Sequence, residues 1–328
     1  MIYHDKAIAN TFGLEAVADT YIEYGSVEEL ACEIGQAPRP FLHVGGGSNL
    51  LFAVRRFSGT VFHNAAAGIK VLSCDSDGVL LKVGGGLIWD EFVQWCVAQG
   101  YYGAENLSLI PGEAGAAAVQ NIGAYGAEAG DIVECVEAFD TVTGSKRTFS
   151  RSECRYGYRS SFFKTEEGRR FFVLSVTFRL GTEPRLNLSY GPLKELENPT
   201  LEQVRARIVA VRREKLPDPA AIGSAGSFFK NPVVPQGQYE ALAALYSDMP
   251  HYPAAGGTVK LSAGWLIDRC GYKGFRKGRA GVYDKQALVL VNFGGATAAE
   301  IISLADEIAG AVSKKFGVDL QAEVQVVK

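Results

Sequence analysis

One short run, residues 226–232, gathers groups that could deliver a proton inside a dry pocket. Its sequence is Gly226-Ser227-Phe228-Phe229-Lys230-Asn231-Pro232. A hydroxyl lies between a glycine and two aromatic residues, an ammonium follows three residues later, and a proline ends the run. An ordinary strand would alternate apolar and polar side chains here. The run therefore indicates proton delivery, and the alternative is an aromatic edge strand with a solvated lysine.

A first glycine loop, Gly45-Gly46-Gly47-Ser48-Asn49, directly follows a short apolar segment at 41–44. Because glycine has no Cβ, the amides of such a loop can turn toward a bound anion. The third glycine of a Rossmann fingerprint is replaced by Leu50, and no Gly-Lys-Ser/Thr ending is present. The loop therefore predicts a phosphate cradle of another type, with a glycine-rich hairpin as the alternative.

A second loop, residues 110–126, is longer and rich in glycine and alanine. Its small residues would let a flat or extended ligand lie against the backbone, and we expect it to make a poor helix; a tightly packed turn is the alternative. Together the two loops fit a large cofactor with a diphosphate and a ring system, and FAD is the candidate. The predicted cofactor-binding residues are Gly45, Gly46, Gly47, Ser48, Asn49, Pro111, Gly112, Gly115, Ala116, Gln120, Asn121, Gly123, Ala124 and Tyr125.

The elements that position these loops alternate between strand and helix. Three capping boxes, at Ser26–Glu29, Thr200–Gln203 and Thr297–Glu300, predict helix starts. The second of these helices is expected to bury Leu201, Val204, Ile208 and Val211. Further expected elements are strands at 41–44, 79–83, 133–142 and 171–180, a helix at 88–99 with Ile88, Phe92, Trp95 and Cys96 on one face, and a last strand at 319–326. In that last strand Glu323 would lie on the polar face with Gln321 and Gln325.

The run Leu216-Pro217-Asp218-Pro219 reads as a stiff hinge, because two prolines separated by an acid cannot continue either regular structure. It is the best domain boundary in the sequence. We expect a first cofactor-binding subdomain over residues 1–65 and a second over 66–216. A substrate domain would then span residues 217–320, and residues 321–328 would form a terminal strand that returns to the active site.

Composition excludes several classes of partner. The chain has 328 residues, with 33 basic and 36 acidic residues and a net charge of -3, so no global field recruits nucleic acid or an anionic membrane. No run reaches the ~20 apolar residues of a membrane span, and the first residues lack the features of an export signal. We therefore expect a cytoplasmic, monomeric protein. The six scattered cysteines suit reduced thiols, and the four separated histidines predict no metal site.

Several motifs occur in the same order as in a known enzyme family, and the resemblance covers nearly the whole chain. Besides both glycine loops and the run at 226–232, they are Asn10-Thr11-Phe12-Gly13, the segment 156–164, the hinge at 215–219, the segment 263–268 and Ala322-Glu323-Val324. The sequence thereby resembles the UDP-N-acetylenolpyruvoylglucosamine reductases, in the subgroup with an inserted Ser189-Tyr190-Gly191 loop. The resemblance implies an α+β chain: an FAD-binding fold of the vanillyl-alcohol-oxidase type in two subdomains, plus a C-terminal α/β substrate domain.

The resemblance also implies a reaction. NADPH would reduce FAD, and hydride would pass from the flavin to the enolpyruvyl methylene of a UDP-sugar in peptidoglycan precursor synthesis. Arg159 and Glu323 would stabilise the negative charge that develops, and Ser227 would protonate the carbon. Glu323 can help only when protonated or through a water. Without the resemblance, Arg159 would read as a surface ion pair and Glu323 as an exposed strand carboxylate.

The family pattern further places Tyr158, Tyr190, Lys215, Asn231, Tyr252 and Gln286 on the substrate. Glu113 departs from the pattern, because a small or hydroxyl residue is usual there. A carboxylate would repel the flavin phosphates, so we expect Glu113 to point away from them. Arg212 and Arg213 are explained by the favourable dipole at a helix C-terminus. The alternatives are another flavoenzyme of the same superfamily and a nucleotide-sugar binding protein without activity.

Overall fold

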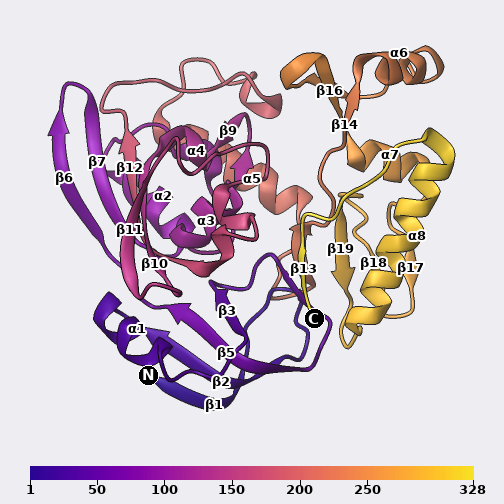
Figure 1. Cartoon of the computed structure of the whole chain (residues 1–328). Coiled ribbons are helices and arrows are strands. Elements are labelled where there is room, and N and C mark those ends of the chain that lie inside the picture. The colour runs from indigo at the N-terminus through magenta and orange to yellow at the C-terminus, as the bar shows by residue number, and fades with distance from the viewer. The chain divides into compact units, whose positions relative to one another are not determined.

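The computed structural model describes residues 1–328, and the chain forms two compact units that we describe separately. Unit 1 comprises residues 1–8, 17–47 and 56–212, and unit 2 comprises residues 9–16, 48–55 and 213–328. Figure 1 shows the elements of both units along the chain. The domain limits expected from the sequence are a different division and stay a prediction.

Unit 1 contains two principal sheets. In the first, β2 pairs with β1 antiparallel, and β5 pairs with β2 and β3 parallel. The second sheet is antiparallel, in the order β11-β10-β12-β7-β6. The strands of these sheets and of a small hairpin are β1 (Ile2–Ala7), β2 (Val17–Tyr24), β3 (Phe41–Val44), β5 (Arg56–Asn64), β6 (Ile69–Asp75), β7 (Gly78–Gly84), β8 (Gly123–Ala124), β9 (Ala127–Glu128), β10 (Val133–Asp140), β11 (Ser145–Ser150) and β12 (Phe171–Leu180).

Helices of unit 1 pack on these sheets through buried apolar faces. Trp89 and Phe92 of α2 lie in one core with Phe178 of β12, and their rings are 4.8–5.7 Å from its ring. This burial removes large aromatic surfaces from water and fixes the helix against the second sheet. The helices are α1 (Val27–Ile34), α2 (Trp89–Ala98), α3 (Ala114–Gln120), α4 (Ala129–Ile132) and α5 (Leu201–Lys215), with short 3-10 turns at Glu105–Leu107, Phe162–Lys164, Gly168–Arg170 and Gly191–Leu193.

Unit 2 is built on antiparallel sheets and three helices. One sheet has the order β13-β19-β18-β17 and a second the order β14-β16-β15, while β20 pairs parallel with β4. The elements are β4 (Leu50–Phe52), β13 (Gly223–Ser227), β14 (Val233–Pro235), α6 (Gln236–Leu245), β15 (His251–Pro253), a 3-10 turn at Ala255–Gly257, β16 (Thr258–Leu261), α7 (Ala263–Arg269), β17 (Arg276–Lys277), β18 (Ala280–Val282), β19 (Val289–Asn292), α8 (Ala298–Phe316) and β20 (Gln325–Val327).

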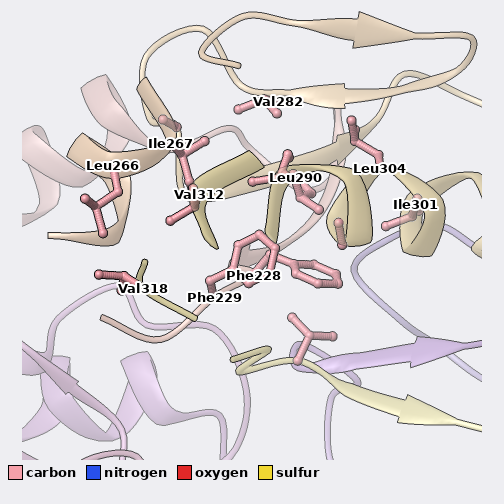
Figure 2. Close-up of a cluster of buried hydrophobic side chains, with 14 of the residues drawn as sticks. Phe228, Phe229, Leu266, Ile267, Val282, Leu290, Ile301, Leu304, Val312 and Val318 are labelled. Carbon is pink, nitrogen blue, oxygen red and sulfur yellow. The ribbon is translucent and has the colours of Figure 1, made fainter. Parts of the chain in front are cut away.

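The core of unit 2 surrounds the two phenylalanines of the 226–232 run. Phe228 and Phe229 are each 3% exposed, and their rings meet edge to face at 5.1 Å. Figure 2 shows both rings within the cluster that α8 and β19 form, close to Leu290 and Val312. The aromatic pair therefore anchors the backbone on either side of it, including Ser227, to a packed core.

Most expected elements are confirmed. All three capping boxes begin helices, and α5 buries the four apolar residues predicted for it.

Two predictions of the sequence analysis were wrong. Residues 114–120 form helix α3, because a run of alanines has high helix propensity despite its glycine. Ile88 is 51% exposed, because it precedes the first turn of α2 with ψ 125, and Trp89 is buried instead. The last strand is also shorter than expected, Gln325–Val327.

Candidate functional site

The first glycine loop leaves β3 and lies against the second loop within unit 1. A Cβ built on Gly45 would stand 3.3 Å from the Cβ of Ala116, and one on Gly46 would stand 3.7 Å from the Cα of Gly112. Gly47 has φ +67, which favours glycine. Among the loop hydrogen bonds, none is donated by the amides of these three glycines. The two predicted loops are thus brought together, with a row of amides available to an anion.

Helix α3 ends at Asn121, whose side chain fixes the second loop. Asn121 is fully buried with φ 45, and its amide nitrogen donates to Glu128 Oε2 at 2.7 Å and to the carbonyl of Gly157 at 2.8 Å. Its amide oxygen accepts from the nitrogen of Gly130 at 2.8 Å. Because these bonds use both polar atoms of the side chain, Asn121 acts by fixing the conformation of the second loop.

Arg159 lies beside the same loop. It occupies a left-handed conformation with φ 53, and its Nη2 donates to the carbonyl of Gly123 at 2.7 Å. Lys164 donates from Nζ to Gln120 Oε1 at 2.9 Å and to the carbonyl of Arg159 at 3.0 Å. The guanidinium also lies 5.5 Å from the ring centre of Tyr158. The structure therefore brings Arg159, Gln120, Gly123 and Tyr158 together with Lys164, while their roles stay a prediction.

Arg212 is a second cation in this region, which the sequence analysis explained only by the dipole at the C-terminus of its helix. It lies on α5, and its Nε donates to the carbonyl of Leu109 at 3.2 Å. Burial lowers the pKa of Arg212, partly offset by Tyr125 and Asp90, and Arg159 lowers it further. An arginine remains charged despite such a shift. The helical face it shares with Ile208 and Val211 was the available signal, because that face is buried.

An ion pair between Asp90 and Arg205 helps to fix Leu109, the residue to which Arg212 donates. Asp90 accepts two hydrogen bonds from Arg205, at 2.7 and 2.9 Å, and a third from the amide of Leu109 at 2.5 Å. Burial alone would raise the pKa of Asp90, but the Arg205 and Leu109 bonds outweigh it and hold the pKa below its usual value. Asp90 therefore ties α2, α5 and the start of the second loop together.

Tyr190, the predicted substrate tyrosine, lies in an exposed loop that is attached to the second glycine loop. Its ring meets that of Tyr125 edge to face at 6.0 Å. Asn187 donates to the carbonyl of Gly126 at 3.0 Å, and Asn106 bridges the carbonyls of Tyr125 and Asn187 at 2.8 and 2.9 Å. Burial raises the pKa of the Tyr125 hydroxyl, an effect that the charge of Arg212 opposes. The two predicted tyrosines thus lie side by side.

In unit 2, the 226–232 run pairs with the segment that carries Glu323. The amide of Glu323 donates to the carbonyl of Phe228 at 2.8 Å, and the amide of Lys230 donates to the carbonyl of Gln321 at 2.9 Å. Ser227 follows Gly226, which has φ 69, in an irregular stretch of the β13–β19 pairing. Asn49 joins this group through a 3.3 Å bond from its Nδ2 to the carbonyl of Glu323. Glu323 therefore bonds to the residue that follows Ser227, although the two positions are far apart in sequence.

The remaining predicted substrate residues of unit 2 form two groups. Asn231 Oδ1 accepts from the amide of Ala263 at 3.0 Å, while Gln286 Oε1 would lie 3.0 Å from a Cβ on Gly264, so both flank the start of α7. Tyr252 pairs with Lys260 across β15 and β16, and the lysine Nζ is 5.7 Å from its ring centre. Lys260 was missed because no sequence pattern marks it. Lys215 is exposed at the end of α5.

Glu113 turns its carboxylate to His63, with a 2.9 Å contact between Oε1 and the histidine Nε2. It does not cap α3, although it occupies the N-cap position. Its Oε2 would lie 3.0 Å from a Cβ on Gly45. Glu113 thus lies against the first glycine loop with a histidine as its partner.

The loops are compatible with FAD. The glycines bring two backbones close together without side chains between them, and the row of amides suits a diphosphate. Arg159, Lys164 and Arg212 supply positive charge in the same unit, where an anionic ring system or carboxylate would be stabilised. All six cysteines are free thiols, and no helix is both long and apolar enough to cross a bilayer.

Known proteins match this chain along its length. Residues 19–149 match the model of the FAD binding domain, and residues 218–327 match that of the UDP-N-acetylenolpyruvoylglucosamine reductase C-terminal domain. The UDP-N-acetylenolpyruvoylglucosamine reductase of Bacteroides fragilis (strain YCH46) is 48% identical over 324 residues, 97% of this chain and 97% of the relative. The Pseudomonas aeruginosa enzyme of the same name is 46% identical over 323 residues, 96% of this chain and 95% of the relative.

A solved structure of an enzyme named for the same reaction also matches the fold of this chain. The crystal structure of UDP-N-acetylenolpyruvylglucosamine reductase from Thermus caldophilus superimposes with a TM-score of 0.67 at 25% identity, and the match covers 98% of both chains. These matches confirm the predicted fold class, an α+β FAD-binding fold of the vanillyl-alcohol-oxidase type followed by a C-terminal domain. The chain belongs to the UDP-N-acetylenolpyruvoylglucosamine reductase family.

Proposed function

We propose how the residues of this chain perform the reaction of the family, the NADPH-dependent reduction of UDP-N-acetylenolpyruvoylglucosamine to UDP-N-acetylmuramate in peptidoglycan precursor synthesis. FAD, when bound, accepts hydride from NADPH and supplies it to the enolpyruvyl methylene carbon. The adjacent substrate carbon then gains carbanion character that can spread only into a carboxylate that is already negative. The chain must therefore place positive charge at that carboxylate and deliver one proton to that carbon.

Arg159 is the proposed partner of the substrate carboxylate. Its planar guanidinium is permanently charged and matches a carboxylate in shape. The 2.7 Å bond from Nη2 to the carbonyl of Gly123 supports this role, because it holds the group at the second glycine loop. Arg212, held at Leu109, adds positive charge on the same side, and we include it in the site. Both cations lower the energy of a transition state that is more negative than the substrate.

Ser227 is the proposed proton donor, and Glu323 the carboxyl group that assists Arg159. The observation that carries this assignment is the 2.8 Å bond from the amide of Glu323 to the carbonyl of Phe228, the residue that follows Ser227. A serine hydroxyl is a weak acid, so it can protonate only a strongly basic carbon. Lys230, three residues further on, lies on the same paired segment and is suited to supporting the charge that Ser227 acquires.

The other residues divide between cofactor and substrate. We propose that the first loop, Gly45–Asn49, and the second loop from Pro111 to Tyr125 hold FAD, with Asn121 acting through the loop shape it fixes. The sugar nucleotide would contact Tyr158, Tyr190, Lys215, Asn231, Tyr252 and Gln286, together with Lys260. The arrangement of Tyr190 beside Tyr125 supports a tyrosine that lies next to both ligands.

Stopped-flow spectroscopy of the Ser227→Ala variant tests the mechanism. Flavin reduction by NADPH should stay within about twofold of the native rate, while reoxidation by the enolpyruvyl substrate should slow by about 10²–10⁴-fold, the usual contribution of a positioned acid. Ser303→Ala, on the exposed face of α8, is the matched control and should leave both rates unchanged. Native reoxidation in Ser227→Ala would remove Ser227 from the mechanism. A colourless chain that takes up no FAD would refute the whole proposal.

We also propose the domain limits 1–65, 66–216, 217–320 and 321–328, a monomeric state and a cytoplasmic location. Light scattering of the purified protein and fractionation of cells that produce it would test the last two. Limited proteolysis should cut first in the hinge at 216–219 if that segment separates two independently folded parts.

A further inference from the structure

The carboxylate of Glu113 lies against the backbone that we propose binds the FAD diphosphate. A Cβ built on Gly45 would be 3.0 Å from Glu113 Oε2, and one on Gly46 would be 3.9 Å from Oε1. The Glu113 side chain is only 12% exposed, so water screens its charge poorly. An uncompensated carboxylate beside this loop would oppose binding of any diphosphate there.

His63 on β5 lies between two carboxylates. Its Nε2 is 2.9 Å from Glu113 Oε1, and its Nδ1 is 3.6 Å from Glu23 Oε1. Nδ1 is buried and has no hydrogen-bond partner. A neutral imidazole has one nitrogen without a proton, and in either tautomer that nitrogen would face a carboxylate. The geometry therefore favours the doubly protonated imidazolium.

The other titratable groups around His63 are either uncharged or paired elsewhere, so none of them neutralises Glu113. On β1, Lys6 already pairs with Glu23 at 3.0 Å and lies over the rings of Tyr3 and Tyr21. On β3, burial lowers the pKa of His43 to about 3, so that it is uncharged, and it bonds to Tyr24 at 2.8 Å. The Tyr21 ring on β2 is 6.3 Å from the imidazole and also stays neutral, because burial raises its pKa. His63 is thus the cation that faces Glu113.

We infer that His63 is a positioning residue for the cofactor: as an imidazolium it neutralises Glu113 and holds it beside the first glycine loop, so that FAD retention depends on the proton of His63. The inference rests on the proposed placement of the diphosphate at Gly45–Gly47. It assigns a task to a histidine and a glutamate that the proposed chemistry does not use.

The dependence on pH has a definite sign. The hydrogen bond that His63 donates to Glu113 raises the pKa of His63 above its ordinary 6.5, burial opposes this, and the charges of Glu113 and Glu23 add to it. A bound dianion would raise that pKa further, so FAD binding takes up a proton once the pH exceeds the pKa of the free protein. Affinity should therefore be greatest at low pH and should fall as the pH rises, by about tenfold for each unit by which FAD raises the pKa.

Titration of the full chain, stripped of FAD, with FAD at about pH 6 and about pH 9 tests the inference through flavin fluorescence. Native protein should bind at least about tenfold more tightly at the lower pH. His63→Gln should bind at both pH values as weakly as native protein does at the higher one. Glu113→Gln and the double variant H63Q/E113Q should bind tightly at both values, because the opposing charge is gone. His4→Gln, an exposed histidine on β1, is the matched control and should behave like native protein.

Restoration by the double variant separates charge compensation from a merely structural role. The inference is overturned if His63→Gln binds FAD like native protein at about pH 6, or if the double variant binds no better than His63→Gln. Should His63→Gln fail to fold, NMR titration of the native imidazole decides: the midpoint should lie above 6.5 and rise on addition of FAD. A midpoint at or below that value overturns it. Absence of FAD binding at every pH would instead refute the proposed function.

Discussion

Asp90 offers the sharpest test of how the second glycine loop is held. Its carboxylate receives three hydrogen bonds, two from Arg205 and one from the amide of Leu109. Asp90→Asn keeps the shape but removes the charge and leaves the Arg205 guanidinium half-buried without its counter-ion. Breaking a fully buried pair costs about 3–5 kcal/mol, and side-chain exposures of 15% for Arg205 and 25% for Asp90 reduce the expected cost to about 2–4 kcal/mol.

Thermal and urea unfolding would measure this loss. For a unit of about 200 residues, each kcal/mol lowers Tm by about 2–4 °C, so Asp90→Asn should lower it by about 4–16 °C. Glu134→Gln, which breaks the exposed pair with Arg179 at 3.1 Å, is the matched control and should cost less than about 1 kcal/mol.

The pH dependence gives a second check on the same variant. The folded pKa of Asp90 is lowered, so its contribution is fully present above the ordinary value of 3.8 and is lost as the pH falls through the folded pKa. The stability gap between native protein and Asp90→Asn should therefore be constant from about pH 7 to about pH 5 and narrow only in stronger acid. The reasoning would be refuted if Asp90→Asn lost no more unfolding free energy than Glu134→Gln. It would also be refuted if the difference between native protein and Asp90→Asn became smaller between those two pH values.

Two further substitutions probe the backbone of the site. Gly226→Ala should cost about 1–2 kcal/mol, because φ is +69 and a Cβ there meets nothing, and it should slow flavin reoxidation through displacement of Ser227. Gly310→Ala in α8, also with open space around it, should instead stabilise by about 0.5–1 kcal/mol in urea unfolding, and equal effects would show that backbone strain is not the cause. Asn121→Ala should cost about 3–5 kcal/mol and weaken FAD uptake, because it removes three hydrogen bonds of a buried side chain and leaves the buried Gly130 amide unsatisfied. Asn121→Gly is the control, because glycine adopts the left-handed backbone without strain. If it loses as much unfolding free energy as Asn121→Ala, the cost belongs to the missing side chain. A negligible loss would contradict the role given to the hydrogen bonds of Asn121.

Local signals in the sequence predicted much of the fold because they depend on neighbouring residues. The boxes at Ser26, Thr200 and Thr297 begin helices as expected, and the periodicity of α5 gave its buried face. The alanine run of α3 was misjudged because the glycines around it suggested a loop, whereas helix propensity decided the outcome at 114–120.

The site was harder to predict than the elements, because its partners are distant in sequence. Motif order predicted Ser227 and Glu323 as site residues, and their roles stay a prediction. The bond from the amide of Glu323 to the carbonyl of Phe228 joins segments roughly a hundred residues apart, which no local pattern specifies. The partners of Glu113 and Arg212 could not be predicted either. No sequence pattern marks His63 as the partner of Glu113 or Leu109 as the partner of Arg212, because these contacts form only in the folded chain. The expectation that Glu113 points away from the phosphates stays a prediction. It was based on the charge of Glu113 alone, whereas in the structure His63 contacts the carboxylate.

The parallel pairing of β20 with β4 has a consequence for how the polypeptide acquires its shape during synthesis. Val326 pairs with Leu51, and the segment 9–16 belongs to the same unit. The strand Leu50–Phe52 therefore lacks this partner until residues 325–327 have left the ribosome. Apolar side chains such as Phe12 and Leu51 would stay uncovered over that interval, and exposed apolar surface of this kind favours aggregation.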